Sequence, residues 1–148
     1  MKPEAAVKLE RKWGWLVFPV HKWLFKTTRG KVGGTFEGRP MLLLHHVGRK
    51  TGQQRETLIQ YYPNGEQMVI VGSNGGRDTH PAWVHNVRAN PDVEVDVGGN
   101  RRRATAHVLD DSERDALWPK LTQWYPGYGH YQTLTDRRIE LVALTPKP

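Results

Sequence analysis

Residues 41–62 read MLLLHHVGRKTGQQRETLIQYY, two largely apolar runs on either side of a basic segment that is framed by glycines. We expect strands at Met41–Val47 and Glu56–Tyr62, because both runs are short, rich in large apolar or aromatic residues, and bounded by turn residues. Gly48 and Gly52 allow the chain between them to turn tightly or to approach a ligand closely. The stretch therefore predicts a pair of strands with a basic turn between them.

Four further segments have the same character and are expected to be strands: Gln67–Gly72, Asp92–Val97, Arg103–Leu109 and Ile139–Leu144. Between them, the segments PNG (residues 63–65) and GGN (residues 98–100) suit hairpin turns. The sequence therefore predicts six short strands, most of them joined as hairpins.

Two helices are expected among these strands. The first lies within residues 81–91, which begin and end with proline and carry apolar residues at positions that a short helix would bury. The second runs from Asp110 to Trp124, where apolar residues recur at helical spacing and Asp111 or Ser112 can act as the N-cap. Six strands with helices tucked between them predict a mainly β, α+β fold built on an antiparallel barrel.

The size and composition of the chain indicate one soluble domain. Its 148 residues divide into an N-terminal helical and aromatic segment, residues 1–26, and a barrel, residues 27–148. Its 22 Lys and Arg against 15 Asp and Glu give a net charge of +7, which favours nucleic acid, anionic lipid or a small phosphorylated or carboxylated ligand. The absence of cysteine excludes disulfides and thiolate chemistry and fits a reducing, cytoplasmic compartment.

The N-terminal apolar run, WGWLVFPVHKWLF from Trp13 to Phe25, has two interpretations. It is too short to span a bilayer, and Pro19, His21 and Lys22 interrupt it. With its basic neighbours it can rest peripherally on the inner face of an anionic membrane. The alternative, which we favour, is a helix that packs over the core or caps a ligand pocket.

The basic turn of residues 48–55, GRKTGQQR, is the first candidate site. It places the positive charges of Arg49, Lys50 and Arg55 within eight residues, next to glycines that expose the backbone. Phosphate or carboxylate groups suit such a turn. Taken alone, however, the turn is equally consistent with a solvated hairpin tip whose basic residues maintain solubility.

Two other segments could contribute to a ligand site. Residues 72–81, GSNGGRDTHP, form a glycine-rich loop whose amides, together with the following helix N-terminus, could hold a polar ring edge or an anion. Tyr125, Tyr128 and Tyr131 recur at intervals of three and would share one face of a helical turn. They could stack on a planar substrate and donate a hydrogen bond or a proton, or else pack as aromatic cover over the barrel mouth.

Metal, hydrolytic and nucleic-acid chemistry have less support. His45 and His46 are adjacent and point to opposite faces of a strand, and His80 and His85 lie five apart across a helix start, so neither pair is expected to share a metal-binding face. The chain has no GxSxG elbow. The arginines of residues 101–103 lack the interleaved stacking residues of nucleic-acid readers. We therefore expect neither a metal nor a nucleic-acid partner.

Together, GRKTGQQR, the block GSNGG…HPAWVHNVRANP and the segment WYPGYGHYQTLTDRRIELVAL resemble the deazaflavin-dependent nitroreductase family, actinobacterial proteins that use coenzyme F-420. The resemblance covers roughly residues 30–146, with the motifs in order. It implies a split β-barrel of the FMN-binding-protein type. It also implies an oxidoreductase that transfers a hydride from the reduced deazaflavin to an electron-poor small molecule, such as a quinone, a nitroaromatic or an activated alkene.

The resemblance also assigns residues to a site. The basic turn would bind the phosphate and acidic tail of the coenzyme through Arg49, Lys50, Thr51, Gly52 and Arg55. The residues that would line the deazaflavin ring or close over it are Thr57, Leu58, Ile59, Val71, Gly72, Ser73, Asn74, Ala82, Trp83 and Asn86. Tyr125, Tyr128 and Tyr131 match the substrate-pocket tyrosines of the family, with the proton coming from tyrosine or water.

The chain departs from the family pattern at three positions: Leu58 stands where proline is frequent, Asn74 where some relatives have lysine, and Val84 where tyrosine is common. The alternative cofactor is FMN. The alternative function is a split barrel that binds a cofactor or a lipid without turnover.

Overall fold

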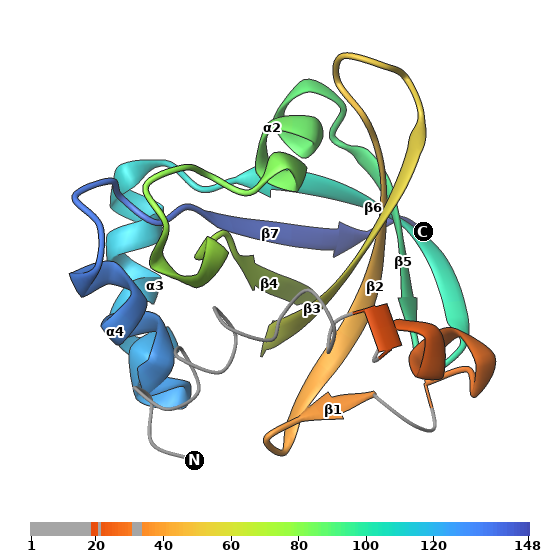
Figure 1. The fold of residues 1–148 in the computed structure, drawn as a ribbon, viewed down its shortest axis with the longest axis horizontal. Helices are drawn as coiled ribbons and strands as arrows, with labels where there is room; N and C mark the ends of the chain where they lie inside the picture. The colour runs from red at the N-terminus through yellow and green to blue at the C-terminus, as the bar shows by residue number, and fades with distance from the viewer. Residues whose placement is uncertain (1–18, 21, 31–33) are drawn as a thin grey trace.

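The computed structural model describes residues 19–20, 22–30 and 34–148 of the chain (Figure 1). The strands are β1 (Thr35–Phe36), β2 (Arg39–Val47), β3 (Gln54–Asn64), β4 (Gln67–Val71), β5 (Asp92–Val97), β6 (Asn100–Val108) and β7 (Leu141–Pro146). The helical elements are η1 (Asn74–Gly76), α2 (Ala82–Ala89), α3 (Asp111–Trp124) and α4 (Pro126–Thr133), and residues 22–27 are helical as well.

In the described part of the chain, six antiparallel strands close into a barrel in the order β2-β3-β4-β7-β6-β5, and β5 pairs back onto β2. The short β1 is not part of the closed barrel; it pairs with the first residues of β2, before the β2–β3 ladder begins. The β5–β6 hairpin turns through Gly98 and Gly99, whose φ angles of 58° and 84° suit the two-residue turn that such hairpins favour. The mainly β, split-barrel architecture expected from the sequence is confirmed.

Strand β2 is buried on both faces, which explains its unbroken apolar run. Leu42 and Leu44 point into the barrel and join a core cluster with residues of β4, β5, β6, β7 and α2. Met41 and Leu43 point outward and pack with Phe25 and with Leu58 of β3. Because side chains alternate along a strand, β2 joins the barrel core on one side to the helical residues 22–27 on the other.

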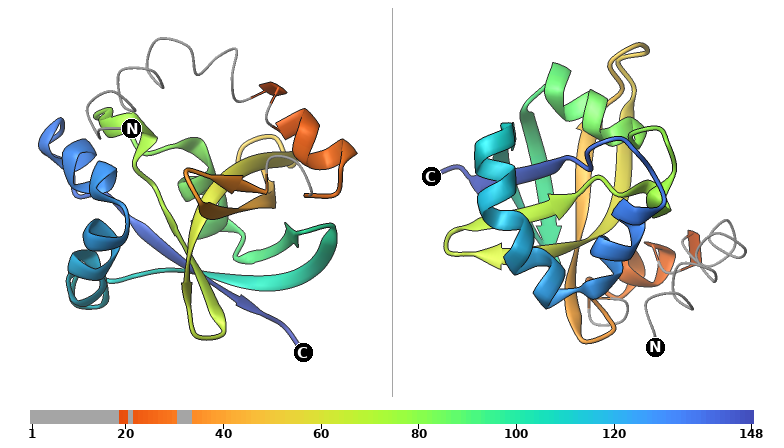
Figure 2. Two further views of the ribbon diagram at one scale, coloured as in Figure 1. Left: turned by 90° about the horizontal axis from the view of Figure 1, so that it is seen from below. Right: turned by 90° about the vertical axis from the view of Figure 1, so that its left-hand side faces the viewer.

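The helices cover two different parts of the barrel. Trp83, Val84 and Val87 of α2 belong to the core cluster that fills the barrel, so α2 closes over that core. Helices α3 and α4 lie side by side against the outer face of β4 and β7 (Figure 2). The glycine-rich loop of residues 72–81 runs from the end of β4 to the start of α2 (Figure 1). Its 3-10 turn, η1, lies against α4 on the way.

Several boundaries differ from those expected. Strand β3 extends beyond Glu56–Tyr62 at both ends and β6 begins at Asn100, because the hairpin ladders continue into the polar residues next to the turns. Strand β7 begins later than expected, at Leu141, because the Ile139 backbone bonds to the side chains of Gln132 and Arg114 instead of joining the ladder with β4. The expected N-cap of α3 was wrong. The cap is Asp110, whose carboxylate accepts a hydrogen bond from the Glu113 amide at 2.8 Å, while the Glu113 carboxylate accepts one from the Asp110 amide at 3.1 Å.

The expected N-terminal segment falls largely outside the described residues, as does most of the apolar run from Trp13 to Phe25. In the part that is described, no helix combines the length and the apolar character needed to cross a membrane.

Candidate functional site

The basic turn between β2 and β3 is a closed, hydrogen-bonded loop. The Gly48 amide donates to the Gln53 carbonyl and the Gly52 amide donates to the Gly48 carbonyl, both at 2.8 Å. The Thr51 hydroxyl accepts from the Gln53 amide at 3.2 Å. Gly52 has a φ of +70°, a conformation that an L side chain rarely adopts. The backbone that carries Arg49 and Lys50 therefore has a defined shape.

Within the described residues, the cations of this turn have no acidic partners. Arg49, Lys50 and Arg55 are exposed, and none forms an ion pair with another described residue. Their field reaches α2, where the pKa of His85 is lowered first by burial and then by the charges of Arg49, Arg88 and Lys50. The three cations of the turn can therefore accept an anion without first breaking an ion pair with a described residue, whereas Arg88 of α2 pairs with Glu140 at 3.6 Å.

A buried chain of hydrogen bonds fixes this turn to the barrel. The Asn86 Oδ1 of α2 accepts from the Arg49 amide at 3.0 Å. Asn86 Nδ2 lies 3.1 Å from His46 Nδ1, and His46 Nε2 lies 3.0 Å from Thr57 Oγ1. His46 and Asn86 are 4% and 7% exposed. Burial, and secondly the charge of Arg55, lowers the pKa of His46 to about 4, so the ring is neutral near pH 7.

Sequence reasoning gave His46 no role beyond the expectation that it and His45 point to opposite faces. That expectation is consistent with the two environments. His46 bonds inward to Asn86 and Thr57, whereas His45 lies 3.9 Å from Glu56 Oε2 on the outer side. The signal that could have identified His46 is its alternation with Leu42 and Leu44, which places it on the inner face of β2.

The glycine-rich loop after β4 has little room for side chains. A Cβ at Gly72 would lie 2.8 Å from Val84 Cγ2 of α2 and 3.3 Å from the Glu140 carbonyl oxygen. Asn74 has a φ of 48°, and its side-chain amide donates to the Thr79 carbonyl at 3.0 Å. The loop therefore lies close against α2 and is held in a single local shape.

Arg137, which sequence reasoning missed, is the main anchor of this loop. Its guanidinium donates to the carbonyls of Gly72 at 3.2 Å, Ser73 at 2.8 Å and Arg77 at 2.8 Å. It also lies 3.3 Å from His80 Nδ1. Three backbone carbonyls brought to one planar group fix the path of the loop more firmly than its own short 3-10 turn can.

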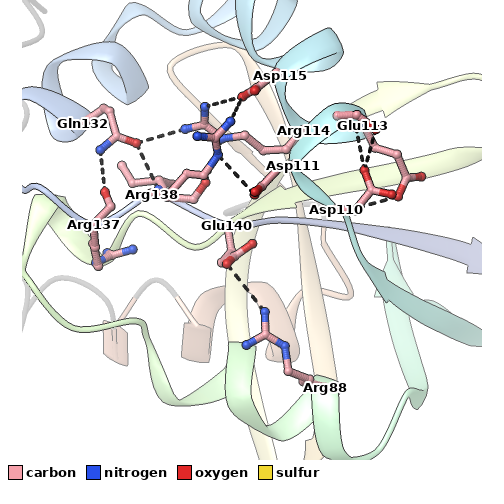
Figure 3. A network of polar contacts seen from close by, with 12 residues as sticks. Arg88, Asp110, Asp111, Glu113, Arg114, Asp115, Gln132, Arg137, Arg138 and Glu140 are labelled. Atoms are coloured by element: carbon pink, nitrogen blue, oxygen red, sulfur yellow. Dashed lines mark hydrogen bonds and ion pairs between the residues drawn. The ribbon is translucent and has the colours of Figure 1, made fainter.

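Figure 3 shows how this anchor continues into the helices. The Gln132 side chain of α4 donates to the Arg137 carbonyl at 2.7 Å, and its Oε1 accepts from Arg114 Nη2 at 2.9 Å. Arg114 is buried, lies over the Trp118 ring at 4.0 Å and donates to the Ile139 carbonyl at 3.1 Å. A continuous polar network therefore links α3 and α4 to the glycine-rich loop.

The three tyrosines lie along the buried face of α4, from its N-cap to its last turn. Tyr125 is the N-cap, and all three side chains pack with Val69 and Leu141 on the outer face of β4 and β7. The Tyr125 and Tyr128 rings meet edge to face at 4.8 Å. Gln60 Nε2 donates to the Tyr128 hydroxyl at 3.2 Å. The expected helical clustering is present, and a role in substrate binding stays a prediction.

The structure separates some residues that the sequence grouped. Thr57 pairs with Leu44 and Ile59 with Leu42, so both lie on the inner face of β3, whereas Leu58 packs outside the barrel. His80 and His85, which were not expected to share a metal-binding face, are nevertheless neighbours in the fold. Their rings meet edge to face at 5.6 Å, because extended Pro81 brings His80 back alongside the first turn of α2. In the described chain, however, no group of three His, Asp or Glu could hold a metal ion.

Comparison with known proteins identifies the family to which the chain is similar. The family model for F-420H(2)-dependent quinone reductase matches residues 17–146. An F-420H(2)-dependent quinone reductase of Mycobacterium tuberculosis (strain ATCC 25618 / H37Rv) is 38% identical over 141 residues, covering 93% of this chain and 95% of that protein.

Two solved structures share the fold. One, of an F-420H2-dependent reductase, is 36% identical with a TM-score of 0.64 and covers 72% of this chain and 94% of its own. The other, described as a domain-swapped dimer, is 33% identical with a TM-score of 0.65 and covers 85% of this chain and 98% of its own. The chain belongs to the F-420H(2)-dependent quinone reductase family.

Proposed function

We propose that this protein is a coenzyme F-420-dependent oxidoreductase that reduces a quinone by hydride transfer. The observation that carries the proposal is the basic turn, whose three cations are unpaired among the described residues, in a chain of the quinone reductase family. An anion with several negative charges, such as a phosphate joined to carboxylates, explains three unpaired cations on one turn better than a solvated hairpin tip does. The alternative of a merely solubilising turn leaves its anchoring to Asn86 unexplained.

The residues present fit a flat, anionic cofactor. Arg49, Lys50 and Arg55 would hold its phosphate and carboxylates, with Thr51 and Gly52 shaping the turn. The ring would lie against the chain segments that Arg137 and Asn86 fix in place, namely Val71, Gly72, Ser73 and Asn74, the inner-face β3 residues Thr57 and Ile59, and the α2 residues Ala82 and Trp83. The Leu58 side chain packs with Phe25 on the other face of β3, so Leu58 would contribute through its backbone. When bound, the coenzyme supplies the hydride from C5 of its reduced deazaflavin.

The protein's own contribution is to orient the acceptor and to provide a proton. A quinone that gains a hydride needs one proton to become the hydroquinone. We assign that proton to the tyrosine group, with Tyr128 as donor and with Tyr125 and Tyr131 packing around the acceptor. Because Gln60 donates to the Tyr128 oxygen, it would stabilise the phenolate that remains after the proton leaves.

Titration of the purified protein with oxidised coenzyme F-420, followed by deazaflavin fluorescence, tests the cofactor assignment. Saturable quenching at micromolar coenzyme is the expected result. The variant Lys50→Ala/Arg55→Ala should raise Kd about tenfold or more and flatten its salt dependence, since a hydrogen bond to a charged group contributes about 1.5–3 kcal/mol. Lys120→Ala, on the exposed side of α3, is the matched control and should leave Kd unchanged.

Three results would count against these assignments. No binding by the wild type would reject the cofactor. Unchanged affinity in the double variant would place the acidic tail elsewhere. Binding without any quinone reduction would favour the rival function of a carrier that holds a cofactor or a lipid without turnover.

We further propose that the N-terminal helical residues contact an anionic membrane, from which a lipophilic quinone would be drawn. Phe25 anchors residues 22–27 on the barrel, so Trp23 and Val20 face solvent with 62% and 58% of their surface exposed. Lys22 and Lys26 lie beside them, although Lys26 pairs with Glu56 at 2.9 Å. Exposed aromatic residues with basic neighbours are typical of interfacial helices.

Co-sedimentation with vesicles tests this contact. The protein should bind vesicles containing phosphatidylglycerol, and bind vesicles of phosphatidylcholine alone much more weakly. Trp23→Ser should reduce binding about fivefold or more, because burying its ring is worth about 1–3 kcal/mol. Leu134→Ser removes another exposed apolar side chain and should have no effect. Equal binding by wild type and Trp23→Ser would refute the contact.

A further inference from the structure

His46 lies behind the basic turn and takes no part in the proposed hydride and proton transfers. It occupies the inner face of β2, is 4% exposed, and follows Leu42 and Leu44 along the same face of the strand. Its ring links Asn86 of α2 to Thr57 of β3 through contacts of 3.1 Å and 3.0 Å. It is therefore the centre of a chain that starts at the backbone of the basic turn and ends at a hydroxyl on β3.

The donor and acceptor of each hydrogen bond in this series follow from the bond between the Arg49 amide and Asn86. The Arg49 amide can only donate, so the Asn86 atom 3.0 Å from it must be the carbonyl oxygen. The other end of the Asn86 amide, its NH2 group, then faces His46 Nδ1 and donates to it. His46 Nδ1 must accept, which places the ring proton on Nε2, and Nε2–H donates to Thr57 Oγ1.

The Thr57 hydroxyl consequently has its own proton left to donate. One lone pair of the oxygen is taken by His46, and no described residue accepts a hydrogen bond from this hydroxyl. Thr57 pairs with Leu44 in the β2–β3 ladder, two residues after Arg55 of the basic turn. A hydroxyl donor is thereby held close behind a group of cations.

We infer that His46 is a positioning residue, which in its neutral Nε2–H form holds the basic turn against α2 and keeps the Thr57 hydroxyl as a hydrogen-bond donor to an acceptor atom of the bound coenzyme. The inference rests on the proposed function only for the identity of that ligand. The order of donors and acceptors within the protein does not depend on it.

The surroundings of the ring keep it in this form. Burial and the nearby charge of Arg55 oppose a second ring proton, and the pKa of His46 falls to about 4. A charged ring would also point an Nδ1–H at the Asn86 NH2 group, so that two donors would face each other. A doubly protonated His46 would therefore release Asn86, and with it the amide of Arg49.

Nitrogen NMR of the coenzyme-free protein tests the arrangement directly. With 15N-labelled histidine, the His46 ring should show a protonated Nε2 and an unprotonated Nδ1 at pH 7. Its pKa should lie well below the ordinary histidine value of 6.5. The Nδ1–H tautomer, or a charged ring at pH 7, would overturn the inference whether or not the protein binds the coenzyme.

Coenzyme affinity in a double-mutant cycle tests the positioning role, with fluorescence titration as the readout. His46→Phe should raise Kd about tenfold and Thr57→Val about fivefold, as expected for one or two lost hydrogen bonds. The double variant should bind within about twofold of His46→Phe, since both changes break the same chain. His45→Phe, next along the strand but on its outer face, is the matched control and should leave Kd within about twofold.

Each outcome has a defined meaning. Strictly multiplicative effects, or an unchanged Kd in His46→Phe, would overturn the positioning role. An equal loss in His45→Phe would attribute the effect to general weakening of the barrel and would also overturn it. If His46→Phe does not fold, Thr57→Val still decides whether the hydroxyl contributes to binding. Failure of the wild type to bind would reject the proposed cofactor, and the NMR result would stand separately.

Discussion

Replacing Arg137 is the sharpest test of how the glycine-rich loop is held. Arg137→Met keeps the length of the side chain but removes the donors to Gly72, Ser73 and Arg77, at 3.2, 2.8 and 2.8 Å. Hydrogen bonds from a charged group contribute about 1.5–3 kcal/mol each, and water can re-solvate the half-exposed Ser73 and exposed Arg77 carbonyls. We therefore take about 1 kcal/mol per bond and expect a loss of about 3 kcal/mol.

The assays are urea and thermal unfolding followed by tryptophan fluorescence, with coenzyme titration on the same variants. A loss of this size should lower Tm by about 6–12 °C for a chain of this length. Kd for coenzyme F-420 should rise about tenfold, because the loop would sample other conformations before binding. Arg137→Lys keeps the charge but not the planar fork, and should recover less than half of the loss.

The neighbouring Arg138 provides the control. It is exposed and pairs with Asp111 and Asp115 at the surface, where ion pairs contribute about 0–1 kcal/mol. Arg138→Gln should therefore change the free energy of unfolding by less than about 1 kcal/mol and leave Kd unchanged. If Arg137→Met behaved like Arg138→Gln in both assays, the loop would not depend on the guanidinium and the reasoning would be refuted.

Three further outcomes are expected. Tyr128→Phe should slow quinone reduction at least about tenfold while leaving coenzyme Kd within about twofold. Equal turnover would show that the Tyr128 hydroxyl, which accepts a hydrogen bond from Gln60, has a structural role and is not the proton donor. Gly72→Ala should cost about 1–3 kcal/mol of stability, measured by urea unfolding, because its Cβ would lie 2.8 Å from Val84 Cγ2. The pKa of His46, about 4 in the fold against an ordinary 6.5, means that the unfolded chain binds a proton that the folded one does not. The free energy of unfolding should therefore decrease as the pH is lowered from 6.5 to 4, with a slope that approaches about 1.4 kcal/mol per pH unit. His46→Phe should remove this contribution to the pH dependence.

The parts of the fold that could be predicted from the sequence are those that depend on residues close together along the chain. The apolar run at Met41–Val47, the glycine pair at residues 98–99 and the helical spacing before Trp124 each depend on near neighbours, and each appears in the structure. Strand ends were less predictable, because polar residues beside the turns join the ladders only when the partner strand is present.

The basic turn and the tyrosine group could also be recognised locally, but the groups that hold them could not. His46 reaches Asn86 across 40 positions, and Arg137 reaches Gly72 across 65. The alternation of His46 with Leu42 and Leu44 indicates which face of β2 it occupies but not which residues it contacts, and Arg137 follows a helix with no pattern that marks it as an anchor. Their role depends on which side-chain and backbone polar groups the closed barrel brings within 3.3 Å of them, and that is a property of the tertiary structure alone.

The two polar networks hold different parts of the proposed site, and their independence can be measured. His46 contacts Asn86 and Thr57, while Arg137 contacts the loop carbonyls and His80, so the two have no partner residue in common. Helix α2 is the element next to both, since it carries Asn86 and packs Val84 against Gly72. We expect α2 to keep its position when either anchor is lost. The decreases in the free energy of unfolding caused by His46→Phe and by Arg137→Met should then add to within about 0.5 kcal/mol in the double variant. A larger coupling would contradict this, and would mean that α2 transmits the loss of one anchor to the other.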